Sequence, residues 1–122
     1  MFQNGVDLKT YSNYKIGGQA RQFYHAKNVE ELSAAVQKAK SEKLPIFILG
    51  GGTNLLISDT GFRGLVLKPD IRILQANETK VRVGAGVQMS EFLNFLISQS
   101  LSGLEWAGGL PGTVGGAIRG NA

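Results

Sequence analysis

The sequence predicts an α+β fold. Three observations support this fold class: two amphipathic helical segments, several short apolar runs typical of strands, and an element order without regular βαβ alternation. The chain has 122 residues, which is the length of one domain or part of one. Its hydrophobic fraction of 43% is sufficient for a buried core.

The clearest element is a helix over 28–40. Asn28, followed by Glu31 three residues later, forms a capping-box pattern at its start. Its apolar face recurs at helical spacing and consists of Val29, Leu32, Val36 and Ala39. Before this helix, residues 1–20 are polar and turn-rich, and the segment with Tyr11, Tyr14 and Ile16 that ends at Gly17-Gly18 is expected to form a small packed turn. Arg21–Ala26 is predicted to be a strand.

Short strands and a second helix are predicted for the remainder. Pro45–Leu49 is β-branched and aromatic, which predicts a buried strand. Further strands are expected at Leu65–Leu67, around Ile71 and Ile73, and around Val81 and Val83, with a hairpin turn at Asn77–Thr79. The second helix has an apolar face of Met89, Phe92, Leu93, Leu96 and Ile97, and it should end at Ser102-Gly103.

Composition excludes several classes of site. The chain has no cysteine and one histidine, so disulfides, thiolate metal sites, cysteine nucleophiles and sites with two histidine ligands are excluded. The formal net charge is +4 with no basic cluster, so nucleic acid is not expected as a partner. The sequence shows no signal peptide and no apolar run long enough for a membrane helix. We therefore expect a soluble, cytoplasmic protein with no membrane partner and no obligate protein partner.

Glycine makes up 17 of the residues and is concentrated in two segments. The first is Gly50-Gly51-Gly52 with Thr53 and Asn54, directly after a predicted strand. Successive glycine N–H groups can point into one concavity and bind phosphate oxygens without a lysine. The alternative is an ordinary tight turn. No Lys-Ser/Thr pair follows Gly52, which excludes a Walker-type loop.

The second glycine-rich segment runs from Gly109 to Ala122. Pro111 can open a helical turn, whose free N–H groups would face an anion. The alternative is a glycine-rich packing turn. A third, shorter pattern at Gly84-Ala85-Gly86 resembles a dinucleotide fingerprint, but Met89 stands where its third glycine belongs. Two glycine clusters of this kind suggest one extended ligand lying along both.

The remaining candidates favour structural roles. His25 lies in a predicted strand, and Trp106 is expected in the core. Arg119 beside Asn121 is as consistent with a solvated charge as with a site. The sequence contains no acid pair, Ser-His-Asp set or metal-ligand cluster, so any reactive centre is a cofactor or lies outside this chain.

Four motifs occur in one order: NYKIGG (13–18), FILGGGTNLL (47–56), VRVGAGV (81–87) and GLEWAGGLPGTVGGAIRGNA (103–122). Together they resemble the UDP-N-acetylenolpyruvoylglucosamine reductases, also called UDP-N-acetylmuramate dehydrogenases or MurB. The resemblance implies an α+β FAD-binding domain of the vanillyl-alcohol-oxidase (PCMH) type. Its two small subdomains would span about 1–68 and about 69–122, with the C-terminal substrate domain absent. Other PCMH-type oxidoreductases, or a non-enzymatic nucleotide-binding module, are the alternatives.

The resemblance also implies a set of cofactor contacts. Residues 50–54 would hold the FAD diphosphate, residues 112–117 would lie towards the flavin, and Asn121 would fall close to the isoalloxazine. The full implied set is Leu49, Gly50, Gly51, Gly52, Thr53, Asn54, Leu55, Gly86, Pro111, Gly112, Thr113, Gly115, Gly116, Ala117 and Asn121. Thr53 and Asn54 stand where some relatives carry a flavin-linked histidine, so FAD is expected to bind non-covalently.

The family reaction uses NADPH to reduce FAD, which then delivers hydride to the enolpyruvyl double bond of the UDP-sugar. The product, UDP-N-acetylmuramate, is a peptidoglycan precursor. A serine acid, an arginine and a glutamate complete the chemistry in the family, and all three would lie beyond residue 122. No catalytic residue is therefore assigned to this chain, which alone is expected to be inactive.

Overall fold

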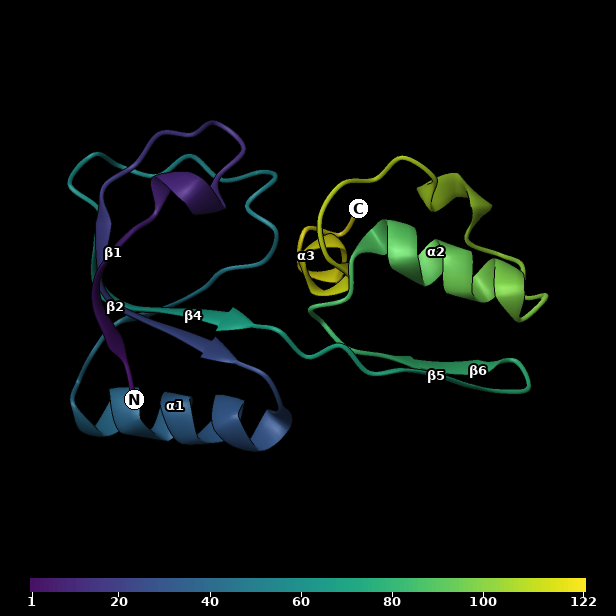
Figure 1. The fold of residues 1–122 in the computed structure, drawn as a ribbon, viewed down its shortest axis with the longest axis horizontal. Helices are drawn as coiled ribbons and strands as arrows, with labels where there is room; N and C mark the ends of the chain where they lie inside the picture. The colour runs from purple at the N-terminus through teal and green to yellow at the C-terminus, as the bar shows by residue number, and fades with distance from the viewer.

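The computed structural model describes all residues, 1–122, and shows two lobes side by side (Figure 1). The first lobe holds a four-stranded sheet and one helix; the second holds a two-stranded hairpin and two helices. The elements are β1 (Gln3–Asp7), β2 (Gln19–Ala26), α1 (Val29–Ser41), β3 (Ile46–Ile48), β4 (Phe62–Pro69), β5 (Leu74–Asn77), β6 (Lys80–Val83), α2 (Met89–Ser98) and α3 (Val114–Arg119), with short 3-10 turns at Lys9–Tyr11 and Glu105–Ala107.

The first sheet has the strand order β1-β2-β4-β3. β2, β4 and β3 run parallel, while β1 is antiparallel to β2. One face of this sheet packs against α1 through Ala35, Ala39, Leu65 and Leu67. The other face packs under the loops through Leu8, Phe23, Leu49 and Val66. Because the parallel strands end at the same edge, the segment after β3 leaves the sheet where ligands of open α/β sheets bind.

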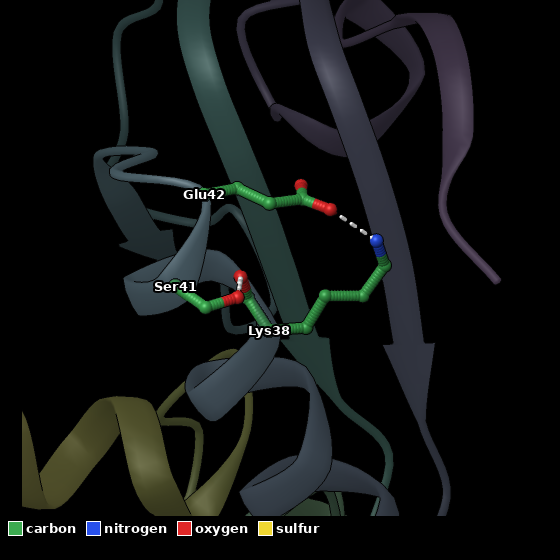
Figure 2. A network of polar contacts seen from close by, with 3 residues as sticks. All are labelled: Lys38, Ser41 and Glu42. Atoms are coloured by element: carbon green, nitrogen blue, oxygen red, sulfur yellow. Dashed lines mark hydrogen bonds and ion pairs between the residues drawn. The ribbon is translucent and has the colours of Figure 1, made fainter.

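Helix α1 forms where the sequence predicts it. The Asn28 side chain accepts a hydrogen bond from the Glu31 N–H at 2.7 Å, which satisfies a free donor of the first turn. The Glu31 carboxylate accepts from the Lys27 N–H at 2.8 Å, one residue earlier than a capping box requires. At the other end, Lys38 pairs with Glu42, and the Ser41 hydroxyl donates to the Lys38 carbonyl at 2.8 Å (Figure 2).

The second lobe also follows its sequence pattern. Met89, Phe92 and Leu96 of α2 are buried in one cluster, which the hairpin covers with Leu74, Val81 and Val83. The hairpin pairs Asn77 with Lys80, so Glu78 and Thr79 form the predicted turn. Ile97 is the one residue of the predicted α2 face that is exposed. None of the helices has the length and apolarity needed to cross a membrane.

Three predictions of strands are wrong. Residues 3–7 form β1 instead of a turn, since this exposed polar strand is stabilised by pairing with β2. Pro45–Leu49 is not a buried strand: β3 is the edge of the sheet, and Phe47 and Ile48 are exposed. The strand expected around Ile71 and Ile73 starts only at Leu74. Ile71 is buried and accepts from the Gly86 N–H, so it packs without belonging to a regular ladder.

Two predictions of buried side chains are also wrong. Val29 sits in the first turn of α1 and is exposed, because the buried face of this helix is centred on Ala35 and Ala39. Trp106 is 64% exposed. In its short 3-10 turn it is the neighbouring Ala107 that enters the core of the second lobe.

Candidate functional site

The two glycine-rich segments meet between the lobes. We call residues 50–54 the glycine loop and residues 112–116 the C-terminal glycine segment. A Cβ built on Gly51 would lie 3.0 Å from the Cα of Gly112, and one built on Gly50 would lie 3.8 Å from the Cα of Gly116. In Figure 1, α3 accordingly lies on the side of the second lobe that faces the first. Segments about 60 residues apart thus form one site.

The glycine loop carries a row of unpaired backbone donors. None of the N–H groups of residues 50–54 donates a hydrogen bond to any group of the protein, and the same is true of Gly112 and Thr113. Gly52 is nevertheless buried, and Gly50, Gly51 and Thr53 are only partly exposed. Buried N–H groups without a partner are rare in folded proteins. Their clustering at touching segments indicates a site for an anion.

The N-terminal segment holds the glycine loop in place. Gly52 has φ of +71°, and a Cβ here would overlap the carbonyl oxygen of Tyr11, so only glycine fits. The Asn13 N–H donates to the Gly52 carbonyl at 3.0 Å. The buried Ser12 hydroxyl donates to the Leu55 carbonyl at 2.7 Å. These bonds turn the carbonyls of Gly52 and Leu55 towards residues 11–13, and the N–H groups of the loop stay free.

A different set of hydrogen bonds holds the C-terminal glycine segment. The Met89 N–H donates to the Gly112 carbonyl and the Val114 N–H to the Val87 carbonyl, both at 2.9 Å. The Gly115 N–H donates to Ala85 at 3.0 Å. The Thr113 hydroxyl accepts from the Gly116 N–H at 3.2 Å and caps α3. The segment is therefore fixed to the turn that precedes α2.

One cation reaches the glycine loop. Lys68, near the end of β4, donates from Nζ to the Gly50 carbonyl at 2.7 Å. Burial lowers the pKa of Lys68, and the nearby Arg72 charge lowers it further, while Asp70 opposes both effects. A hydrogen bond from Arg72 Nε at 2.6 Å holds the pKa of Asp70 below its ordinary value.

His25 lies beside Lys68 in the sheet register. Its ring packs against Phe23 and Tyr11, with centroids 5.3 Å and 6.3 Å away. Its Nε2 atom is buried without a hydrogen-bond partner. Burial lowers the pKa of His25, and the Lys68 charge adds to this effect. The other ionisable groups around Lys68 are thus His25, whose pKa is lowered, and Asp70, which is already paired with Arg72.

The structure brings most of the residues implied by the resemblance close to one another. Gly50, Gly51, Gly112, Thr113 and Gly116 approach one another directly, and Thr53 contacts Gly112. Leu49, Leu55 and Ala117 pack their side chains against the cores of the two lobes. Gly86 packs tightly against the main chain of Asp70 and Ile71. Pro111 and Asn121 are exposed, and nothing places Asn121 against the glycine loop.

Sequence reasoning did not find the residues that support the loop. Tyr11 and Ser12 contact residues 52–55, and Lys68 contacts Gly50. The motif at 13–18 lies next to Ser12 and was the one available signal for this segment. For Lys68 there was no signal, because its partner is a main-chain carbonyl 18 residues away.

The site presents main-chain donors that suit an anion, and it offers no acid–base chemistry of its own. No carboxylate or histidine hydrogen-bonds to the glycine loop. An apolar cavity of about 170 Å³ lies in the first lobe, which also holds the glycine loop, and is lined by residues such as Leu8, Leu55 and Phe62. Pockets for drug-sized ligands measure about 300–1,000 Å³, so this cavity is too small for a dinucleotide.

Comparison with known proteins gives consistent results. UDP-N-acetylenolpyruvoylglucosamine reductase of Treponema denticola is 41% identical over 133 aligned residues, covering 100% of this chain and 41% of the relative. The enzyme of the same name from Listeria monocytogenes is 39% identical over 116 residues, covering 94% of this chain and 39% of the relative. The chain thus spans about two fifths of the length of these curated relatives.

Fold comparison points to the same group. The crystal structure of UDP-N-acetylenolpyruvylglucosamine reductase (MurB) from Thermus caldophilus superposes with a TM-score of 0.79 at 30% identity, covering 100% of this chain and 43% of that one. This match confirms the α+β architecture predicted from the sequence. The family model described as FAD binding domain matches residues 20–122, which include both glycine segments. The chain belongs to this FAD-binding domain family.

Proposed function

We propose that this chain is the FAD-binding portion of an NADPH-dependent flavoenzyme that reduces UDP-N-acetylglucosamine enolpyruvate to UDP-N-acetylmuramate in peptidoglycan precursor synthesis. Membership of the FAD-binding domain family supports the cofactor. The names of the relatives, which match along the whole chain, support the reaction. The observation that carries the proposal is the meeting of two glycine segments in which the N–H groups of residues 50–54, Gly112 and Thr113 have no partner in the protein.

The residues of the site fit the diphosphate of FAD. A diphosphate presents several acceptor oxygens and negative charge, which match the free N–H groups of residues 50–54, Gly112 and Thr113. The close approach of Gly51 and Gly112 leaves main chain, without side chains, along the junction of the segments. We assign the two binding halves to about 1–68 and about 69–122, and FAD would lie between them.

Bound FAD would supply hydride transfer, accepting hydride from NADPH and passing it to the enolpyruvyl double bond. The residues of this chain hold and orient the cofactor: the glycine loop takes the diphosphate, and residues 112–117 continue along the cofactor towards the flavin. Neither a cysteine nor a histidine, the usual sites of covalent flavin attachment, occurs in either segment, which supports non-covalent binding of FAD. The UDP-sugar and the proton donor would contact parts of the full-length relatives that this chain does not match.

The first test is direct binding. The purified chain should bind FAD more tightly than FMN or riboflavin, as measured by quenching of flavin fluorescence, because the diphosphate and adenosine are part of the recognised ligand. Denaturation should release unmodified FAD. Equal affinity for riboflavin and FAD, or no binding of FAD, would contradict the proposal.

The second test concerns the reaction. In a chimera, residues 1–122 replace the matching segment of the Treponema denticola relative. We expect this chimera to oxidise NADPH when UDP-N-acetylglucosamine enolpyruvate is added. A chimera that binds FAD yet shows no substrate-dependent oxidation, beside an active parent enzyme, would count against the assigned reaction and leave FAD binding intact.

A further inference from the structure

Lys68 is partly buried and has no acidic partner in contact. It lies near the end of β4 on the sheet face that also carries the buried Val66, because side chains alternate along a strand. The ion pairs of the structure are Lys38–Glu42 and Arg72–Asp70. Asp70 is the carboxylate that affects the pKa of Lys68, and its side chain is hydrogen-bonded to Arg72. Burying part of an ammonium group without a counter-ion costs free energy unless hydrogen bonds or another negative charge stabilise it.

The one hydrogen bond of this ammonium goes to a main-chain oxygen of the candidate site. Lys68 Nζ donates to the Gly50 carbonyl at 2.7 Å, and no other group of the protein donates to that oxygen. Hydrogen bonds from charged donors are roughly twice as strong as neutral ones. The orientation of the Gly50 carbonyl therefore depends on Lys68.

That carbonyl belongs to the same peptide unit as the Gly51 N–H. All peptide bonds are trans, so the C=O and N–H of this unit point in opposite directions. With the Gly50 oxygen turned to Lys68, the Gly51 N–H points away from it, and it is among the unpaired donors of the glycine loop. Both residues of the unit are glycines, whose backbone would otherwise rotate at little cost.

We propose that Lys68 is a positioning residue that fixes the Gly50–Gly51 peptide so that the Gly51 N–H faces the diphosphate. The ligand identity in this inference rests on the proposed function. Lys68 acts through the peptide and does not need to touch the ligand. Its positive charge also offsets part of the negative charge of the ligand. His25, Asp70 and Arg72 are the other ionisable groups around it.

The test compares Lys68→Met with Lys27→Met. Both substitutions remove one positive charge and keep a long apolar side chain. Lys27 is exposed, follows the end of the neighbouring strand β2 and makes no hydrogen bond through its side chain. We expect Lys68→Met to weaken FAD binding by about tenfold or more, as is typical for loss of a charged hydrogen bond. Lys27→Met should change it by less than about twofold, and Lys68→Arg should recover part of the loss.

A second measurement isolates the positioning role. In the ligand-free chain, the ¹H–¹⁵N resonance of the Gly51 amide should shift in Lys68→Met and stay in place in Lys27→Met. A weaker FAD affinity with an unmoved Gly51 resonance would overturn positioning and leave only a charge effect. Equal FAD affinity of the two variants would overturn the inference entirely. If Lys68→Met does not unfold cooperatively, Lys68→Ala replaces it, because its side chain has no donor and also leaves the Gly50 oxygen unpaired.

These outcomes separate the inference from the proposed function. A wild-type chain that does not bind FAD would overturn the proposed function and the role of Lys68 in binding. A wild-type chain that binds FAD, beside a Lys68→Met variant that binds it equally well, would overturn the role of Lys68 alone.

Discussion

Gly52 is the residue at which the glycine loop is most tightly constrained. It combines φ of +71° with a backbone approach of Tyr11 that leaves no room for a Cβ. Gly52→Ala should cost about 1 kcal/mol for the backbone conformation and about 1–3 kcal/mol more for overlap with Tyr11. Gly109→Ala is the matched control, since Gly109 has φ of +86° but open space around it. Chemical denaturation should therefore show a clearly larger loss for Gly52→Ala, and similar losses would contradict this account of the loop.

At the scale of elements, the turn before α2 and the first turn of α3 act as one unit. A Cβ on Gly115 would lie 2.8 Å from the Cβ of Ala85, so the two segments touch across their hydrogen bonds. Gly115→Ala favours the helix by about 1 kcal/mol, but the overlap should cost about 1–3 kcal/mol. In an Ala85→Gly background the contact at 2.8 Å is removed, and Gly115→Ala should cost clearly less than in the wild-type chain. A double-mutant cycle measures this coupling, and additive effects of the two changes would contradict it.

At the scale of the whole molecule, the two lobes meet through glycine segments, with separate cores on either side. A ligand that takes N–H groups from both segments should link the stability of the lobes. FAD at about 100 times its Kd should add about 2.7 kcal/mol, which corresponds to a rise in Tm of about 10 °C. Hydrogen exchange should slow at residues 50–54 and at 112–116 together. Slower exchange in only one segment would contradict binding between the lobes.

The parts of the fold that were predictable are those set by local pattern. Helix α1 follows from its apolar spacing and its Asn28 cap, and the hairpin turn follows from polar residues between alternating strands. β1 was missed because four of its five residues are exposed and its stability comes from pairing with β2. β3 looked buried because its residues are apolar, but its position at the sheet edge exposes Phe47 and Ile48.

For the site, the glycine segments could be named from the sequence, whereas their supports could not. A glycine cluster indicates that the main chain there closely approaches another group, but it does not indicate which group or where in the chain that group lies. The partners of Gly52 and Gly50 are main-chain or long-range groups, namely the Tyr11 carbonyl and the Lys68 ammonium. Contacts of this kind leave no pattern in the sequence, because a carbonyl is present at every residue.

By itself, the sequence determined that this chain has two glycine-rich segments able to present bare N–H groups, and that helices and strands separate them. Only the tertiary structure decided that Gly51 and Gly112 touch and that the N–H groups of residues 50–54, Gly112 and Thr113 stay unpaired. The physical reason is that the conformational freedom of glycine is a local property, while the distance between two loops is set by the sheet edge and the helices that carry them.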